Sequence, residues 1–273
     1  MNLILIFPEE VTPGNLVRLA DGRARHIRTI LRAEPGKALR IGLLNGPFGT
    51  GTVEEISEES VTLTCEWEDE VPPRPLIDLL LAMPRPKVLK RLWAQFAALG
   101  VGRIILTNAE KVERFYFDTH VLNPDFYNAR LIEGLQQARD TRLPEVTLVK
   151  QLKPFLENEL DNLFPESGKK LIADPSGERS LFQTLENLNK KTAAVGKRDA
   201  LAPCPEEARV AESAVPQCSC LAIGPEGGWT PSELEMFQAH GFEVFGMGPR
   251  ILRTDTACIG LMSLLAESLR NGV

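Results

Sequence analysis

Short apolar segments separated by turn residues fill the N-terminal part of the chain. The segments predicted as strands are Asn2–Phe7, Ala38–Leu44, Gly51–Ile56 and Ser60–Trp67. In the last of these, Val61, Leu63, Cys65 and Trp67 alternate with polar residues, as in a strand with one buried face. Ala24–Leu31 has the pattern of a short helix. Short strands with one small helix predict a compact barrel.

The pattern changes after Pro72-Pro73-Arg74-Pro75. Leu76–Met83 is almost continuously apolar, which is typical of a strand buried on both faces. From Val88 to Leu99, apolar residues recur at three- and four-residue spacing, which predicts a helix that Gly100 ends. Further strands are predicted at Arg103–Thr107, Val146–Val149 and Lys170–Asp174, and a further helix from Asn123 to about Arg139. This alternation predicts an α/β domain with a mainly parallel sheet, beginning near residue 74.

The segment Asn189–Gln217 interrupts this alternation. It carries Lys-Lys, Gly-Lys-Arg and Pro-Cys-Pro among scattered acidic residues, with no periodicity and little apolar content. We therefore expect a flexible insertion there.

Two strand–loop–helix units follow near the C-terminus. In the first, CLAIGPEGGWTPSEL, the strand Cys220–Ile223 enters the glycine-rich turn Gly224–Gly228, and Thr230 to Glu233 has the spacing of a capping box. In the second, FEVFGMGPRILRTDTACIG, the strand Phe242–Phe245 enters a glycine turn before another helix. Both loops lie where parallel strands end, which is where open α/β sheets bind ligands. Neither loop has the GxGxxG or GxxxxGK[ST] pattern, which disfavours a dinucleotide or nucleoside-triphosphate site. Two such turns in succession, each with a proline after a glycine and the second followed by two arginines, favour a ligand cradle over two connecting turns.

Charge is unevenly distributed along this chain of 273 residues, whose net charge is −6. This negative net charge argues against binding of nucleic acid over the whole protein surface. Basic residues nevertheless cluster in Arg23–Arg28, followed by Arg32, and between Pro84 and Arg103, where no acidic residue occurs. Because screening confines a charge to about 10 Å, such clusters can bind phosphate locally. Charge alone leaves a phosphate-binding surface and a solvated helix face equally open.

Composition narrows the protein class. No apolar run approaches the roughly 20 residues of a membrane helix, and the N-terminal apolar stretch is too short for a signal peptide. We therefore expect a cytoplasmic location. The five cysteines are expected to be free thiols of a reducing compartment. A zinc site at Cys204, Cys218 and Cys220 is disfavoured, because these residues form no CxxC pair and no histidine is near them in sequence.

The segments IGPEGGWTPSE and MGPRILRTDTA closely resemble the signature of the bacterial 16S ribosomal RNA uridine-N3 methyltransferases, which belong to the SPOUT superfamily. The resemblance extends over most of the chain. His26–Arg32 is similar to the family's RNA-binding PUA-like barrel, and Met83–Val101 to the start of its methyltransferase domain.

This resemblance implies an architecture and an activity. We expect a PUA-like β-barrel over residues 1–72 and an α/β trefoil-knot methyltransferase domain over residues 75–273. The implied reaction is transfer of a methyl group from S-adenosyl-L-methionine to N3 of a uridine in 16S rRNA of the small ribosomal subunit. The implied assembly is a homodimer, without metal or membrane.

The resemblance also implies how the two loops are used. The expected cofactor-binding residues are Ile223, Gly224, Pro225, Glu226, Gly227, Gly228, Met247, Gly248, Ile251, Leu252 and Thr256. Glycine suits these loops because a β-carbon would collide with a ligand lying on the main chain.

Arg253 is the first candidate catalytic residue and Arg250 the second. A guanidinium group can bind a carbonyl edge or a phosphate beside the reacting nitrogen. For Arg253 the alternative is an ion pair with Asp255 or Glu226. For Glu226 itself, a structural role is favoured over that of a general base. The residues expected to contact RNA phosphates are Arg25, His26, Arg28, Arg32, Arg85 and Lys87.

The chain departs from the family pattern at several positions. The usual Glu-Gln-Ser/Cys-Gly-Arg stretch is Gln136–Asp140 here, Ala98 replaces an acidic residue, and Lys111 replaces the common arginine. These departures lie toward the RNA side of the protein and not the cofactor side, so they concern the RNA target and not the methyl donor. One alternative is therefore a SPOUT methyltransferase that acts on a different RNA or base. A second alternative is a non-catalytic RNA-binding knot protein, against which the two intact loops argue.

Overall fold

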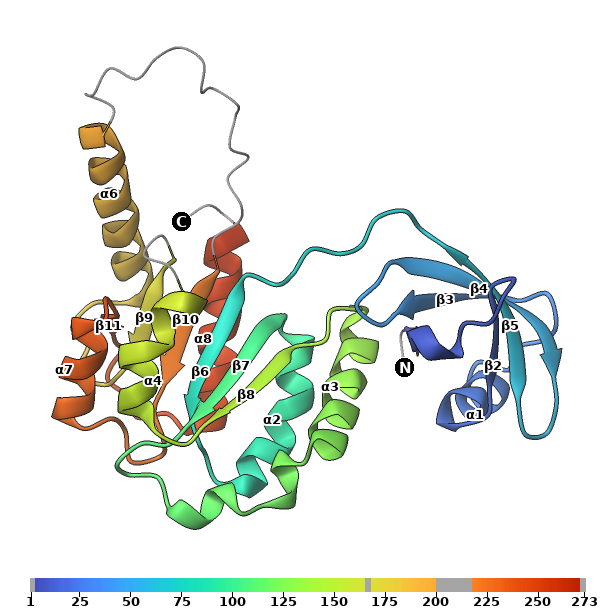
Figure 1. Cartoon of the computed structure of the whole chain (residues 1–273), viewed down its shortest axis with the longest axis horizontal. Helices are drawn as coiled ribbons and strands as arrows, with labels where there is room; N and C mark the ends of the chain where they lie inside the picture. The colour runs from blue at the N-terminus through green and yellow to red at the C-terminus, as the bar shows by residue number, and fades with distance from the viewer. Residues whose placement is uncertain (1–2, 165–167, 200–217, 271–273) are drawn as a thin grey trace. The chain divides into compact units, whose positions relative to one another are not determined.

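The computed structural model describes residues 3–164, 168–199 and 218–270, and for residues 191–199 only the backbone. The chain divides into two compact units (Figure 1). The first comprises Met1–Arg74, Trp93–Leu99 and Asn123–Pro144, and the second comprises Pro75–Leu92, Gly100–Leu122 and Glu145–Val273.

A five-stranded sheet with the order β1-β3-β4-β5-β2 forms most of the first unit. Its strands are β1 (Ile4–Ile6), β2 (Leu16–Leu19), β3 (Ala38–Leu43), β4 (Phe48–Ile56) and β5 (Val61–Trp67). Val61, Leu63 and Cys65 are buried, as their alternation predicts. The sequence did not predict β2, whose short segment places only Val17 and Leu19 in the core, and which pairs antiparallel with β5. The closure of this sheet into a barrel stays a prediction.

Helix α1 (Gly22–Thr29) buries one arginine of the first basic cluster. Arg23 donates hydrogen bonds to the carbonyl of Leu5 at 2.7 Å, to Glu10 Oε2 at 2.8 Å and to Asp21 Oδ2 at 2.7 Å. Asp21 also caps the helix by accepting from the backbone N–H of Arg23. The helix is therefore tied to β1 by a buried cation, while Arg25 on the same helix is exposed.

The first unit also contains α3 (Pro124–Ala138), which begins after the N-cap Asn123, close to the predicted start of this helix. Gly134 lies so close to α2 (Pro86–Ala98) that a β-carbon would be 2.0 Å from the carbonyl oxygen of Ala94. After α3, Thr141 Oγ1 donates to the carbonyl of Gly46 at 2.7 Å in the β3–β4 turn. The first unit therefore includes residues beyond the predicted domain boundary at residue 74.

The second unit is built on a six-stranded sheet with the order β11-β9-β10-β6-β7-β8, in which every pairing is parallel. Its strands are β6 (Ile77–Ala82), β7 (Val101–Thr107), β8 (Glu145–Val149), β9 (Lys170–Ala173), β10 (Ser219–Ile223) and β11 (Glu243–Phe245). The predicted parallel sheet is confirmed. Burial of every residue of β6 explains why its sequence is apolar except at Asp78.

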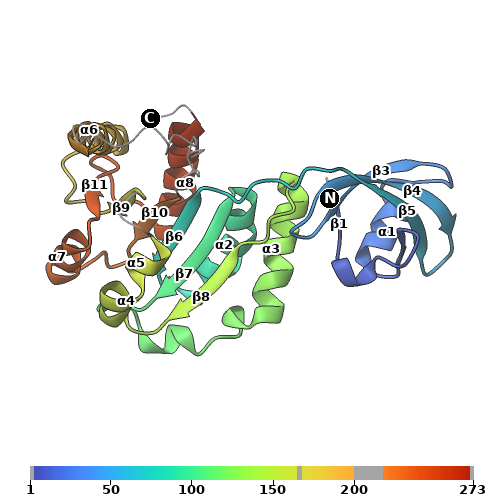
Figure 2. The same cartoon turned by 45° about the horizontal axis from the view of Figure 1, so that its top comes forward.

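Helices flank both faces of this sheet. They are α2 (Pro86–Ala98), α4 (Leu152–Asn158), α5 (Leu160–Leu163), α6 (Leu181–Asp199), α7 (Pro231–Ala239) and α8 (Thr254–Arg270), with the short 3₁₀ turns Arg114–Phe117 and His120–Leu122. The two views show α8 along β6 and β10 on one face and α4 and α7 on the other (Figures 1 and 2). Gly100, at φ +73°, ends α2 as predicted.

The expected flexible insertion is wrong for residues 189–199, because α6 continues to Asp199. Leu181 and Leu185 are buried and anchor the first turns of this helix. Once a helix is nucleated, each added residue costs little, and the lysines and alanines that follow are good helix formers. The rest of the expected insertion, residues 200–217, lies outside the described residues.

Candidate functional site

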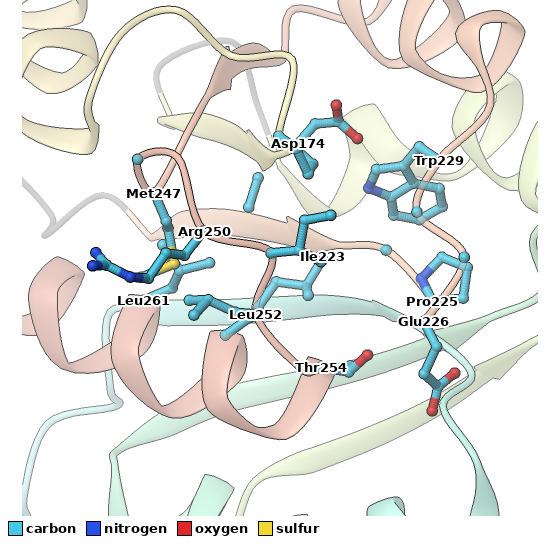
Figure 3. Close-up of a pocket in the computed structure, with 18 residues that line it drawn as sticks. Asp174, Ile223, Pro225, Glu226, Trp229, Met247, Arg250, Leu252, Thr254 and Leu261 are labelled. Carbon is cyan, nitrogen blue, oxygen red and sulfur yellow. The ribbon is translucent and has the colours of Figure 1, made fainter.

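A cavity of about 250 Å³ opens where β9, β10 and β11 end (Figure 3). These strands are neighbours in the parallel sheet, so the loops that follow them meet at one edge. The lining residues are Ala173, Asp174, Pro175, Ile223, Gly224, Pro225, Glu226, Gly227, Gly228, Trp229, Met247, Gly248, Arg250, Ile251, Leu252, Thr254, Ala257 and Leu261. Both glycine-rich motifs of the sequence therefore line a single cavity.

Contacts and backbone conformation within the protein explain why two positions of the β10–α7 loop are glycine. A β-carbon on Gly224 would lie 3.2 Å from both Cδ1 and Nε1 of Trp229. Gly228 has φ +70°, a backbone conformation that side chains disfavour, and a β-carbon there would meet nothing within 4 Å. Gly224 thus makes room for the indole, whereas Gly228 leaves open space beside the backbone.

The same loop is held in place by two neighbouring segments. Lys111 Nζ donates to the carbonyl of Gly227 at 2.9 Å. Glu233 completes the predicted capping box with Thr230, and its second oxygen accepts from the backbone N–H of Glu110 at 2.8 Å. These contacts fix the path of the loop before any ligand is present.

Glu226 also holds a neighbouring segment. Its carboxylate accepts a hydrogen bond from the backbone N–H of Arg85 at 3.1 Å, immediately before α2. A carboxylate is favourable at a helix N-terminus, where N–H groups lack partners. This contact is the kind of structural role favoured for Glu226 from the sequence.

The third wall of the cavity is the loop after β9. Its chain passes so close to the end of β11 that a β-carbon on Gly177 would be 2.2 Å from the carbonyl carbon of Phe245. Asp174 Oδ1 accepts from the backbone N–H of Ser176 at 2.9 Å and from its hydroxyl at 2.7 Å, which fixes the carboxylate. The close approach of Gly177 holds this loop against the β11–α8 loop.

A family model described as "RNA methyltransferase domain" matches residues 72–266. The chain belongs to this family of RNA methyltransferases. A curated relative, the ribosomal RNA small subunit methyltransferase E of Treponema pallidum (strain Nichols), is 31% identical over 274 residues, which cover 98% of this chain and 92% of that protein. The ribosomal RNA small subunit methyltransferase E 1 of Borreliella burgdorferi is 24% identical over 271 residues, which cover 99% of this chain and 100% of that protein.

Solved structures share the fold of this RNA methyltransferase. The ribosomal RNA small subunit methyltransferase E of Neisseria gonorrhoeae bound to S-adenosyl methionine has a TM-score of 0.69 at 20% identity, covering 98% of this chain and 97% of that one. A probable rRNA-methyltransferase of Porphyromonas gingivalis has a TM-score of 0.68 at 19% identity, covering 99% and 100%. At these identities the likeness concerns the fold.

The cavity of the methyltransferase contains most residues expected to bind its cofactor. Thr256 does not line it, whereas all the other expected residues do. Sequence reasoning missed Ala173, Asp174, Pro175, Trp229, Thr254, Ala257 and Leu261. The turn Asp174–Gly177 at the end of β9 was a usable signal, but only the strand order shows that this turn meets the two glycine loops.

The two candidate catalytic arginines of the methyltransferase lie differently. Arg250 lines the cavity and is exposed. Arg253 does not line it, its side chain is 74% exposed, and its Nε lies 3.5 Å from Asp255 Oδ1. Asp255 also accepts from Arg91 at 2.8 Å. The structure therefore contains the ion pair that was the alternative to a catalytic role for Arg253.

The residues expected to contact RNA occur in both units. In the first, Arg25 and Arg32 are exposed, while His26 and Arg28 are half-buried and Arg28 donates to the carbonyl of Ser57 at 2.9 Å. In the second, Arg85 and Lys87 are exposed beside the start of α2.

Cys65, Cys220 and Cys258 are buried free thiols. Burial raises the pKa of Cys65 to about 11, and burial also raises the pKa of Cys220 and Cys258. Within residues 3–164, 168–199 and 218–270, no cluster of three metal-ligating side chains occurs, and no helix there is long and apolar enough to cross a membrane. Cys204 lies outside the described residues.

Proposed function

We propose that this protein transfers the methyl group of S-adenosyl-L-methionine to N3 of a uridine in the 16S rRNA of the small ribosomal subunit. The observation that carries the proposal is the cavity in which the loops after β9, β10 and β11 meet, within a chain of the RNA methyltransferase family. Relatives named ribosomal RNA small subunit methyltransferase E supply the class of RNA, and a structure of this fold holds S-adenosyl methionine. The choice of N3 of uridine rests on the resemblance of the two loop motifs.

The cavity suits such a cofactor. Ile223, Leu252 and Leu261 give it apolar walls for an adenine ring. At Gly228 and Gly248 a β-carbon would meet nothing within 4 Å. These two positions therefore leave room for a ligand along the main chain. Backbone N–H and C=O groups of these loops would then read the polar edges of the nucleoside.

In the proposed reaction the N3–methyl bond forms as the sulfur–methyl bond breaks, S-adenosylhomocysteine is the leaving group, and the imide proton of the base passes to solvent water. When bound, the cofactor supplies the sulfonium methyl group. The task left to the protein is to align the base and to stabilise its anionic form. Arg250 is our candidate for this role, and its support is that it lines the cavity and that a guanidinium can donate to a carbonyl oxygen of the uracil. We keep Arg253 as a second candidate, freed from Asp255 when RNA binds.

The rest of the architecture follows the same resemblance. We propose that the first unit contains a PUA-like RNA-binding barrel, that the second contains a trefoil knot, and that the enzyme is a cytoplasmic homodimer. Light scattering of the purified protein tests the dimer, and a mass equal to one chain would contradict it.

Two measurements test the function. Isothermal titration calorimetry should show binding of S-adenosyl-L-methionine to the folded protein, and absence of binding would favour the non-catalytic alternative. Small subunits from cells lacking the gene should gain one methyl group on a uridine when incubated with enzyme and cofactor. Mass mapping locates that group, and a methyl group on another base or another RNA would favour the second alternative.

The RNA-binding proposal has its own test. Arg32→Glu should weaken RNA binding and reduce its salt dependence, because fewer phosphates are neutralised, while cofactor binding is retained. Glu58→Gln, at an exposed position of the same unit, is the control. Unchanged RNA affinity and salt dependence would remove Arg32 from the interface.

A further inference from the structure

Among the residues that the structure describes, the indole nitrogen of Trp229 is a buried donor without an acceptor. Trp229 is 4% exposed and lines the cavity. Its Nε1 has no hydrogen-bond partner within the part of the chain that the structure describes. In Figure 3 the edge of the ring that carries this nitrogen is turned toward the interior of the cavity. Leaving a buried N–H unpaired costs about 1–3 kcal/mol, so such a group in a binding cavity points to an acceptor on the ligand.

The protein holds this donor in a fixed direction. The ring of Trp229 packs edge-to-face on Phe237, with centroids 4.9 Å apart, and Phe237 packs in the same way on Phe242. On its other side the indole lies against Gly224, where any β-carbon would be 3.2 Å from Nε1. A donor fixed in this way gives specificity, because the indole ring cannot rotate to reach an acceptor in a different position.

Asp174 supplies an acceptor in the same cavity. One oxygen of its carboxylate is occupied by the backbone N–H and the hydroxyl of Ser176, which holds the group in place. Trp229 and Asp174 thus line one cavity, the first with an N–H donor and the second with a carboxylate acceptor. A hydroxyl group both accepts and donates, so vicinal hydroxyls satisfy both side chains at once. An ammonium group only donates and would leave the indole unpaired, and a carboxylate would be repelled by Asp174.

We propose that Trp229 Nε1–H donates to a ribose hydroxyl of the bound cofactor, while Asp174 accepts from the same diol. This inference rests on the proposed function, because it names the part of S-adenosyl-L-methionine that these residues recognise. Trp229 is then a specificity residue for the nucleoside half of the cofactor, beyond the backbone recognition that the glycine loops provide.

Trp229→Phe tests the proposal, because it keeps the aromatic packing and removes the N–H. By calorimetry with S-adenosylhomocysteine, the variant should bind about 3- to 10-fold more weakly than the unsubstituted protein, the value of one neutral hydrogen bond. The loss should persist with methylthioadenosine, which lacks the amino-acid group. Asp174→Asn should also weaken both ligands. Trp67→Phe, in the sheet of the first unit, is the matched control and should bind normally.

The outcomes separate the two proposals. If the unsubstituted protein binds neither ligand, the proposed function fails. If it binds both and Trp229→Phe binds them equally well, only the role of Trp229 is overturned. A loss seen with S-adenosylhomocysteine but absent with methylthioadenosine would move the contact to the amino-acid half and also overturn the proposal.

A second measurement tests the contact without Trp229→Phe, in case that variant does not fold. The unsubstituted protein has three tryptophans, so its NMR spectrum contains three indole N–H signals, and Trp67→Phe assigns one of them. Methylthioadenosine should move one of the other two downfield, as expected for a newly formed hydrogen bond. Unchanged positions of both remaining signals at saturating ligand would refute the contact.

Discussion

Replacing Arg23 by methionine should destabilise the first unit severely, although Arg23 belongs to a basic cluster that looks like an RNA-binding motif. Its side chain is 8% exposed and bridges Glu10 and Asp21. It also donates to the carbonyl of Leu5 in β1. Methionine keeps most of the stem, so the change removes charge and hydrogen bonds more than packing volume.

The magnitude follows from what is left behind. Removing one partner of a buried ion pair costs about 3–5 kcal/mol. The side chain of Asp21 is 54% exposed and regains water, whereas that of Glu10 is 24% exposed and stays largely enclosed. The carbonyl of Leu5 loses its charged donor as well. We therefore expect a loss near the lower limit, about 3 kcal/mol.

Hydrogen exchange measured by mass spectrometry checks this value in the full chain. Peptides from β1 and β5 should lose about a hundredfold of their protection, the equivalent of about 3 kcal/mol. Arg25→Met is the matched control, because Arg25 is exposed on the same helix, and it should leave protection unchanged. Equal protection in the two variants would refute the assignment of Arg23 as a structural cation.

The pH dependence gives a second readout. Burial raises the pKa of Asp21, but the hydrogen bonds and charge of Arg23 outweigh it and hold that pKa below its ordinary value. Such a carboxylate stabilises the fold above its unfolded pKa, and this stability is lost as pH falls below about 4. Arg23→Met should remove this contribution, so exchange in β1 should vary less with pH in the variant.

Three further predictions concern other parts of the chain. Arg139→Gly should stabilise the protein by about 0.5–1 kcal/mol in urea unfolding, because Arg139 ends α3 at φ +59°, and an unchanged midpoint would contradict this. Lys111→Met should weaken S-adenosylhomocysteine binding about 3- to 10-fold by calorimetry, because it removes the hydrogen bond that holds the glycine loop. Lys111→Arg should restore the affinity, and full affinity in the methionine variant would refute this role. At about pH 8, iodoacetamide should modify half-exposed Cys218 before Cys65 and Cys258, which are buried and which their raised pKa values keep protonated. Peptide mapping that finds early modification of Cys65 would contradict this.

Local patterns in the sequence determined much of the second unit. The almost continuous apolar run of β6 predicted a doubly buried strand, and the alternation of strands and helices predicted the parallel sheet. Thr230 and Glu233 predicted the capping box that starts α7, and Gly100 predicted the end of α2. These features depend on neighbours within a few residues, so their chemistry can be read along the chain.

Tertiary structure alone decided which residues share a site. Asp174 and Lys111 come from two other loops, and only the strand order brings them to the two glycine motifs that the sequence displays. Arg23 and Arg25 stand in one basic motif, yet the first is buried beside Glu10 and the second is exposed. A sequence pattern indicates whether a residue type is usually buried and in which kind of element it lies. Which group partners a buried charge or a buried N–H depends instead on contacts between segments that are distant in the sequence.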